Sequence, residues 1–105
     1  MWGAEEVQPS PSTHYTFAQR FGGNLARQRR AAGISQELLA ELAALHRTAV
    51  GQIERGERVA RTDTLVKLCS SLEVDPNVLL SGLLWVPPTI STGRFEYPAG
   101  PDGTT

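Results

Sequence analysis

Cysteine and histidine are nearly absent from this sequence of 105 residues. It contains one cysteine, Cys69, and two histidines, His14 and His46. A single thiol permits neither an internal disulfide nor a thiolate zinc cage, and such sparing use of cysteine is typical of a reducing compartment. The sequence also has no phosphate-binding glycine loop and no cluster of acids suited to a metal ion. We therefore expect no catalytic residues, no metal site, no cofactor and no enzymatic activity.

Long apolar runs are absent as well. No stretch reaches the roughly 18 consecutive apolar residues that a membrane-spanning helix requires. The N-terminal residues MWGAEEVQPSPSTHY lack the basic-then-apolar order of a signal peptide. The sequence therefore predicts a cytoplasmic protein without a membrane partner.

Net charge is low, but the charge is unevenly distributed. The formal net charge is −1 at pH 7, and nine of the ten basic residues are arginine. Residues 20–61 carry eight arginines against four glutamates, a local balance of +4, whereas residues 62–105 have a local balance of −3. For binding a polyanion this local asymmetry matters more than the total. The basic part of the chain is therefore where a nucleic-acid contact is expected.

The start of the chain predicts a flexible arm followed by two helices. Residues 1–15 mix proline, serine and glycine with few apolar side chains, which indicates a flexible arm. Thr16 and Gln19 have the spacing of a capping box, so the first helix should begin there and end at Gly33. A Gly22-Gly23 pair inside this helix predicts loose first turns. Ser35 then caps a second helix, with inward-facing leucines expected at Leu38, Leu39 and Leu42.

Three more helices and a proline-rich extension are predicted beyond residue 45. The third helix spans residues 46–55 and stops at Gly56. A fourth carries Leu65, Val66, Leu68, Cys69 and Leu72, and a fifth begins at Asp75-Pro76 and runs to about Ser81. Alternation around Gly93 favours a short hairpin, and the residues after about 98 are expected to be disordered. The predicted units are an arm over 1–15, a helical domain over 16–82 and an extension over 83–105.

The third predicted helix has two different faces. Val50 and Ile53 lie on one side with Ala49 when the residues are projected at about 100° per residue. The other side is an arc of roughly 140° with no acid in it. It holds Arg47, Thr48, Gly51, Gln52 and Arg55. This composition suits DNA, because arginine recognises guanine, glutamine recognises adenine, and a bare glycine permits close approach of the backbone.

Residues 21–80 resemble the Cro/C1-type helix-turn-helix domain of bacterial and phage repressors, the XRE family. The resemblance rests on three stretches at family spacing, GISQELLAELA, QIERGER and LEVDPNVLL. It implies an all-α, five-helix, lambda-repressor-like fold whose third helix enters the major groove of DNA. Three positions depart from the family pattern. Ala44 stands where the turn usually carries glycine, His46 stands where serine or threonine usually caps the recognition helix, and Ala60 stands where proline is common.

The resemblance also implies roles for individual residues. Arg47, Thr48 and Gln52 match positions that contact bases, and His46 and Gln36 match positions beside the phosphates. Arg55 and Arg58 match the phosphate-contacting loop, and Arg61 and Gly51 join the set on the physical grounds of charge and close approach. The predicted DNA-binding residues are therefore Gln36, His46, Arg47, Thr48, Gly51, Gln52, Arg55, Arg58 and Arg61. Arg29 and Glu54 match a structural ion pair of the family.

The function expected from these features is sequence-specific regulation of transcription. The partner is double-stranded DNA, read as an inverted repeat by a homodimer, in the cytoplasm at the nucleoid. An alternative is an antitoxin or adaptor that also holds a partner protein through residues 83–98. The aromatic side chains there, Trp85, Phe95 and Tyr97, suit either a dimer contact or packing on their own monomer.

Overall fold

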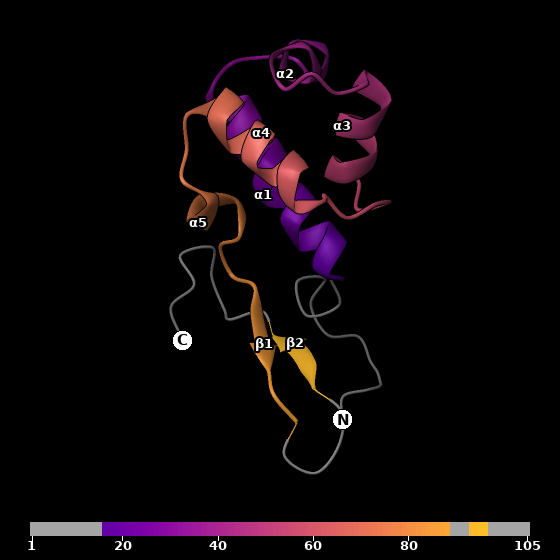
Figure 1. Ribbon diagram of the computed structural model, residues 1–105, viewed down its shortest axis with the longest axis vertical. Helices are drawn as coiled ribbons and strands as arrows, with labels where there is room; N and C mark the ends of the chain where they lie inside the picture. Colours follow the sequence, from indigo (N-terminus) through magenta and orange to yellow (C-terminus); the bar gives the residue numbers. More distant parts are fainter. Residues whose placement is uncertain (1–15, 89–92, 97–105) are drawn as a thin grey trace.

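The computed structural model describes residues 16–88 and 93–96, which form five helices and a small hairpin (Figure 1). The helices are α1 (Phe17–Ala31), α2 (Gln36–Leu42), α3 (Arg47–Glu54), α4 (Thr62–Leu72) and α5 (Pro76–Leu79). The strands are β1 (Leu84–Val86) and β2 (Arg94–Glu96). The five-helix fold and the hairpin are thus confirmed, whereas the expected arm over 1–15 and the disorder after about 98 lie outside the described residues.

The ends of the helices follow the capping residues in the sequence. Thr16 and Gln19 form a reciprocal capping box, in which each side chain accepts a hydrogen bond from the other's backbone N–H, at 3.1 and 3.0 Å. Ser35 Oγ accepts a hydrogen bond from Leu38 N at 3.0 Å and so starts α2. These bonds satisfy backbone donors that a helix leaves unpaired in its first turn. Asp75 precedes α5 without any side-chain capping bond, and α5 ends at Leu79 rather than at Ser81.

One apolar core lies between all five helices. Phe21 and Leu25 of α1 meet side chains from the other four helices. The fully buried ones are Leu39, Val50, Ile53, Leu68 and Leu79. Cys69 belongs to this core and is 4% exposed, as expected for a small apolar residue rather than a redox sensor. Burial of this surface is the main stabilising contribution to the fold.

The prediction that α2 buries three leucines is wrong for two of them. Leu39 is fully buried, but Leu38 is 40% exposed and Leu42 is 55% exposed. The buried residues of this segment are Leu39, Ala40 and Ala43. At about 100° per residue these three share one arc, and the other two leucines fall roughly 60–100° outside it. The core therefore contacts the small side chains of α2, and two leucines remain at the surface.

A buried asparagine joins the start of the fold to its end. Asn24 of α1 is 2% exposed and donates through Nδ2 to the carbonyl oxygens of Leu79 and Ser81, both at 2.9 Å. Arg27 donates to Asn24 Oδ1 at 2.6 Å. Because the polar atoms of a buried asparagine require partners, this arrangement fixes the segment that leads from α5 to the hairpin.

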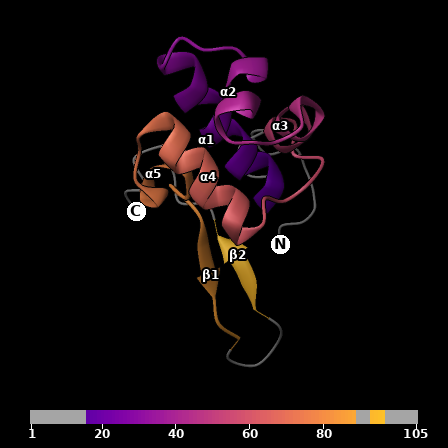
Figure 2. The ribbon, with the colours of Figure 1, turned by 45° about the horizontal axis from the view of Figure 1, so that its top comes forward.

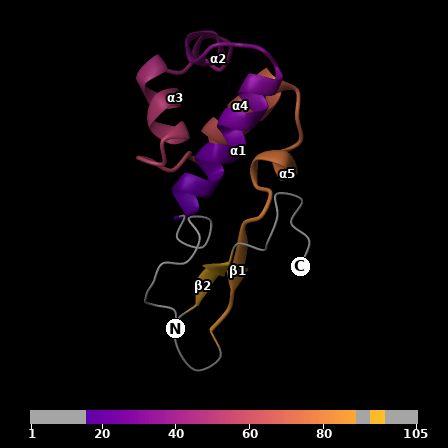
Figure 3. The ribbon, with the colours of Figure 1, turned by 180° about the vertical axis from the view of Figure 1, so that it is seen from behind.

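The hairpin projects from the helical body at the end opposite α2 (Figures 1–3). Its strands are antiparallel, with Leu84, Trp85 and Val86 opposite Glu96, Phe95 and Arg94. The Phe95 ring contacts Phe17 at the start of α1, with a centroid distance of 4.7 Å, and Trp85 edge-on at 5.1 Å. Contacts of this geometry attach the hairpin to the helices. Tyr97 lies outside the described residues.

Candidate nucleic-acid interface

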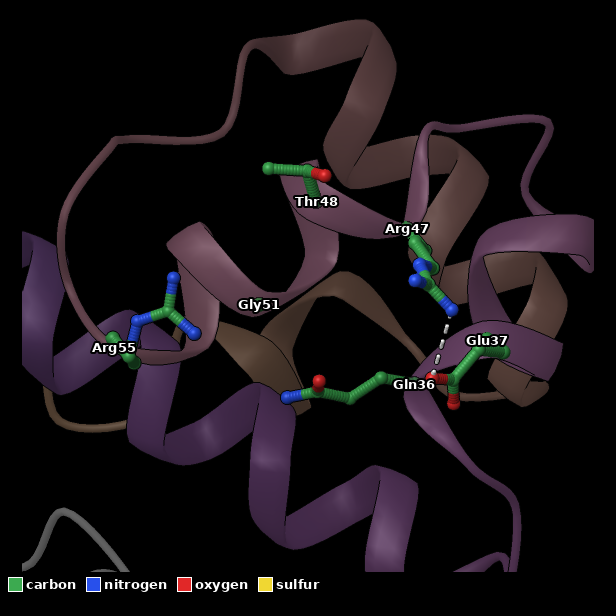
Figure 4. Close-up of a pocket in the computed structure, with 6 residues that line it drawn as sticks. All are labelled: Gln36, Glu37, Arg47, Thr48, Gly51 and Arg55. Carbon is green, nitrogen blue, oxygen red and sulfur yellow. Dashed lines mark ion pairs between the residues drawn. The ribbon is translucent and has the colours of Figure 1, made fainter.

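Helices α2 and α3 border an open, polar hollow of about 240 Å³. Figure 4 shows Arg47 and Arg55 on opposite sides of the hollow, Gly51 between them and Gln36 reaching across from α2. The lining residues are Gln36, Glu37, Arg47, Thr48, Gly51 and Arg55. Five of these six were predicted as DNA-binding residues, and Glu37 was not. We call this hollow the α2–α3 groove.

The turn between α2 and α3 sets the angle of the groove through an unusual alanine. Ala44 has φ 54°, in the left-handed region that favours glycine. The neighbouring backbone is held by a hydrogen bond from Leu45 N to the carbonyl oxygen of Ala40 at 2.8 Å. A non-glycine residue in this conformation costs roughly 1–2 kcal/mol. Ala44, which stands where the family usually has glycine, therefore holds backbone strain beside the groove.

The first turn of α3 presents polar side chains to solvent. His46 is the residue that caps the helix, and its Nδ1 accepts a hydrogen bond from Thr48 N at 3.4 Å. Arg47 and Thr48 follow, and both side chains are exposed. Ala49, Val50 and Ile53 lie on the buried side of the helix. The two predicted faces of α3 are therefore present.

Gly51 lies on the polar side of α3 but is buried rather than bare. An added Cβ would lie 3.1 Å from Arg55 Nη1 and 3.6 Å from Gln36 Oε1. The two side chains thus cover the glycine. A molecule approaching the helix backbone here would first have to move Arg55 or Gln36.

A buried carboxylate joins three helices under the groove. Glu54 accepts two hydrogen bonds from Arg29, Nε at 2.6 Å and Nη2 at 3.1 Å, and a third from Gln36 Nε2 at 2.8 Å. Arg29 also donates to the carbonyl oxygen of Ile34 at 2.8 Å. The side chains of Arg29 and Glu54 are only 12% and 5% exposed, and their hydrogen bonds raise the pKa of Arg29. This is the ion pair that the family resemblance implies, and it also orients Gln36 at the start of α2.

Most of the predicted DNA-facing arginines already have an acidic partner. Arg55 donates to both carboxylate oxygens of Glu57, at 2.8 and 3.2 Å, and this pairing lowers the pKa of Glu57. Arg47 lies 3.6 Å from Glu37. Arg61 Nε lies 3.5 Å from Asp63. These pairings were not predicted, because Glu37 lies on α2 and both Glu57 and Asp63 lie beyond the end of α3, outside its polar face.

Arg58, the fourth predicted DNA-facing arginine, is arranged differently. Arg58 Nη1 donates to Gln52 Oε1 at 3.2 Å, so two predicted DNA contacts are joined to each other. Glu57 and Asp63 each follow an arginine by two residues, and that spacing was the signal available in the sequence. The pairing of Arg47 with Glu37 connects different helices and has no comparable local signal.

Two other features are absent from the described part of the chain. Among residues 16–88 and 93–96, no group of three or more histidines, cysteines or acids could hold a metal ion. Within the same residues, no helix has the length and apolar character to cross a membrane.

Comparison with known proteins identifies helix-turn-helix proteins as the relatives of this chain. A family model described as helix-turn-helix matches residues 25–79, just over half of the chain. The control protein C.SmaI of Serratia marcescens is 40% identical over 58 residues, which are 55% of this chain and 69% of that protein.

Solved structures extend the comparison to the fold. The restriction-modification controller protein C.AhdI of Aeromonas hydrophila superposes with a TM-score of 0.60 at 40% identity. That match covers 62% of this chain and 98% of C.AhdI. The P22 c2 repressor, solved in complex with a synthetic operator, has a TM-score of 0.54 at 25% identity, over 56% of this chain and 89% of the repressor chain.

Proposed function

This chain belongs to the helix-turn-helix family, and from that membership we propose that it regulates transcription by binding specific double-stranded DNA through the α2–α3 groove. The observation that carries the proposal is the exposed first turn of α3. Arg47 and Thr48 stand free of the core there, beside Gln36 of α2. A helix end of this shape and polarity fits the major groove, where the first residues of a recognition helix reach the base edges.

The proposed contacts divide into two kinds. Arg47, Thr48 and Gln52 read base edges, since a guanidinium pairs with guanine O6 and N7 and an amide pairs with adenine N6 and N7. The second kind contacts the DNA backbone and determines position rather than sequence. These residues are Gln36, His46, Arg55, Arg58 and Arg61, and Gly51 permits close approach of the helix backbone once Arg55 and Gln36, which cover it in the free protein, turn toward the DNA. Release of counterions from the DNA makes this second group sensitive to salt.

We further propose that the protein acts as a homodimer on an inverted repeat. Two copies related by a two-fold axis would place their α3 helices one DNA turn apart, roughly 34 Å. Support comes from relatives described as a restriction-modification controller and as a repressor bound to an operator. Such an assembly reads two half-sites, so the binding free energies of the two domains add.

The test is a fluorescence-anisotropy titration of the full chain. DNA from the region upstream of its own gene is compared with a scrambled duplex of equal length at two salt concentrations. The variant is Arg47→Ala, and the matched control is Lys67→Ala, which removes one positive charge from an exposed position on α4. A lost bidentate base contact should weaken binding to the preferred DNA by about 1–3 kcal/mol, roughly tenfold to a hundredfold.

The two outcomes are distinct. Preference for the upstream DNA that collapses in Arg47→Ala but survives in Lys67→Ala supports sequence-specific recognition through α3. Weak binding that is equal for both duplexes and indifferent to Arg47→Ala would overturn the proposal.

A further inference from the structure

The hairpin is an addition to the family domain. The family match ends at residue 79, and β1 and β2 lie beyond it. The hairpin projects from the end of the body opposite α2, away from the α2–α3 groove (Figure 3). Its contribution to function is therefore not explained by the DNA-binding site.

Apolar side chains of the hairpin remain largely uncovered. Leu84 is 49% exposed, Trp85 55% and Phe95 45%, although the Phe95 ring contacts both Trp85 and Phe17. Trp85 and Phe95 lie on one face of the hairpin and Leu84 points to the other face. Large exposed apolar side chains that lie together, as Trp85 and Phe95 do, usually mark a contact with another molecule. Packing on the monomer therefore explains only part of this aromatic cluster.

The backbone of the hairpin is also open to pairing. Among the described residues β2 pairs with β1 and with no other strand. An edge strand presents unpaired N–H and C=O groups to any strand that can lie beside it. Charged side chains on an edge normally prevent this, so the charges decide which partner fits.

We propose that β2 pairs with β2 of a second copy of this chain, antiparallel and centred on Phe95. In that register Arg94 lies opposite Glu96 of the second copy, and the two Phe95 side chains lie opposite each other. A two-fold axis at Arg94 would place the two Arg94 side chains opposite each other, and an axis at Glu96 would place the two Glu96 side chains opposite each other. Parallel pairing in register would oppose like charges at both positions. Only one arrangement of this short strand is thus self-complementary in charge.

The charge pattern favours β2 over β1 as the contact edge. Leu84, Trp85 and Val86 of β1 carry no charge and specify no register. On β2, Arg94 and Glu96 already lie on one side of the strand and form an ion pair at 2.8 Å. A second copy would extend this pair into a ring of four alternating charges on one face of the joined sheet, and the aromatic rings of both hairpins would form a row on the other face.

The inference deepens the proposed function, since it rests on the proposed homodimer and names its contact surface. Joined through their hairpins, the two copies would keep both α2–α3 grooves uncovered. Two short strands and a few aromatic rings bury less than the roughly 1,200–2,000 Å² of a stable interface. The free protein should therefore dimerise weakly and depend on concentration.

Charge reversal tests the register directly. We would measure sedimentation velocity of the full chain without DNA, from about 1 to 100 µM, a range suited to weak dimers. Arg94→Glu and Glu96→Arg should each raise the dimer Kd by roughly tenfold or more, because both cross-strand pairs become like-charged. An equimolar mixture of the two variants should restore association, since each arginine again faces a glutamate. The double variant Arg94→Glu/Glu96→Arg should associate as the natural chain does.

The controls separate this inference from the proposed function. Lys67→Glu reverses one charge on exposed α4 and should leave association unchanged. Helical circular dichroism shows whether each variant folds. A dimer indifferent to both reversals, or single variants that fail to associate when mixed, would overturn the contact but not dimerisation itself. A chain that stays monomeric over the whole range would overturn both. Because no DNA is present, neither result bears on sequence recognition.

Discussion

Two adjacent glycines in α1 should respond oppositely to the same substitution. Gly22 is buried where α1 crosses the last turn of α3, and a Cβ there would collide with the carbonyl oxygen of Ile53 and lie 2.7 Å from that of Glu54. Ordinary van der Waals contact is 3.4–4 Å. Gly23 has no heavy atom within 4 Å of an added Cβ. The pair is a matched test of whether a glycine is present for packing or merely tolerated.

The magnitudes follow from two opposing effects. Alanine in a helix interior is about 0.5–1 kcal/mol more favourable than glycine, so Gly23→Ala should stabilise by that amount. Gly22→Ala gains the same helix propensity but overfills a packed contact, which costs roughly 1–3 kcal/mol or more. The cost should lie at the upper end, because the obstructing atoms belong to the backbone and cannot rotate away. We expect Gly22→Ala to lose about 2 kcal/mol.

Urea unfolding and thermal unfolding, both followed by helical circular dichroism, measure the two changes. A change of 1 kcal/mol moves the melting temperature of a domain this size by roughly 4–8 °C, so Gly22→Ala should melt about 10 °C lower and Gly23→Ala a few degrees higher. Gly22→Ala should also weaken DNA binding in the proposed function, since Ile53 and Glu54 hold the end of α3. Equal effects of the two substitutions, in either direction, would refute the close approach of α1 to α3.

Substitutions at three other positions should change stability or DNA affinity in a stated direction. Ala44→Gly should stabilise by about 0.5–1 kcal/mol in urea unfolding, because relief of the left-handed backbone exceeds the added entropy of the unfolded chain; a lower stability would contradict the strain. Glu57→Gln removes the carboxylate that pairs with Arg55, so the affinity for DNA of any sequence should rise. The slope of log K against log salt concentration should also steepen by about 0.9, and an unchanged slope would refute this expectation. Burial raises the pKa of the Cys69 thiol, so the unfolded chain ionises first as the pH rises. Stability should be constant below the ordinary thiol pKa of about 8.5 and fall above it, and an equal fall in Cys69→Ala would contradict this.

The helices could be predicted because their signals are local. The starts of α1 and α2 are each capped by a side chain that bonds a backbone group three residues away. Thr16 pairs with Gln19 in this way and Ser35 with Leu38, so sequence spacing alone identifies both caps. The α3 faces followed from helical periodicity in the same way. The hairpin around Gly93 was also visible, because alternation and a glycine occur within a dozen residues.

The features that were missed depend on contacts between elements. Leu38 and Leu42 are as apolar as Leu39, and only the placement of neighbouring helices decides which of them is buried. Gly22 and Gly23 are chemically identical in the sequence, yet only one faces α3. The first turns of α1, expected to be loose, are regular helix from Phe17 onward, and the capping box of Thr16 and Gln19 satisfies their backbone donors.

In the proposed function, the paired arginines determine how a chain of net charge −1 binds a polyanion. Arg47, Arg55 and Arg61 each have a carboxylate beside them, so the positive charge of these three arginines is largely compensated in the free protein. Transfer of such an arginine to a phosphate exchanges one anion for another and gains little. For Arg47, the arginine proposed to read bases, transfer to a guanine instead gains two directed hydrogen bonds. In the proposed function the acids therefore lower affinity for arbitrary DNA more than affinity for the correct sequence, and specificity arises from residues that need not touch DNA at all.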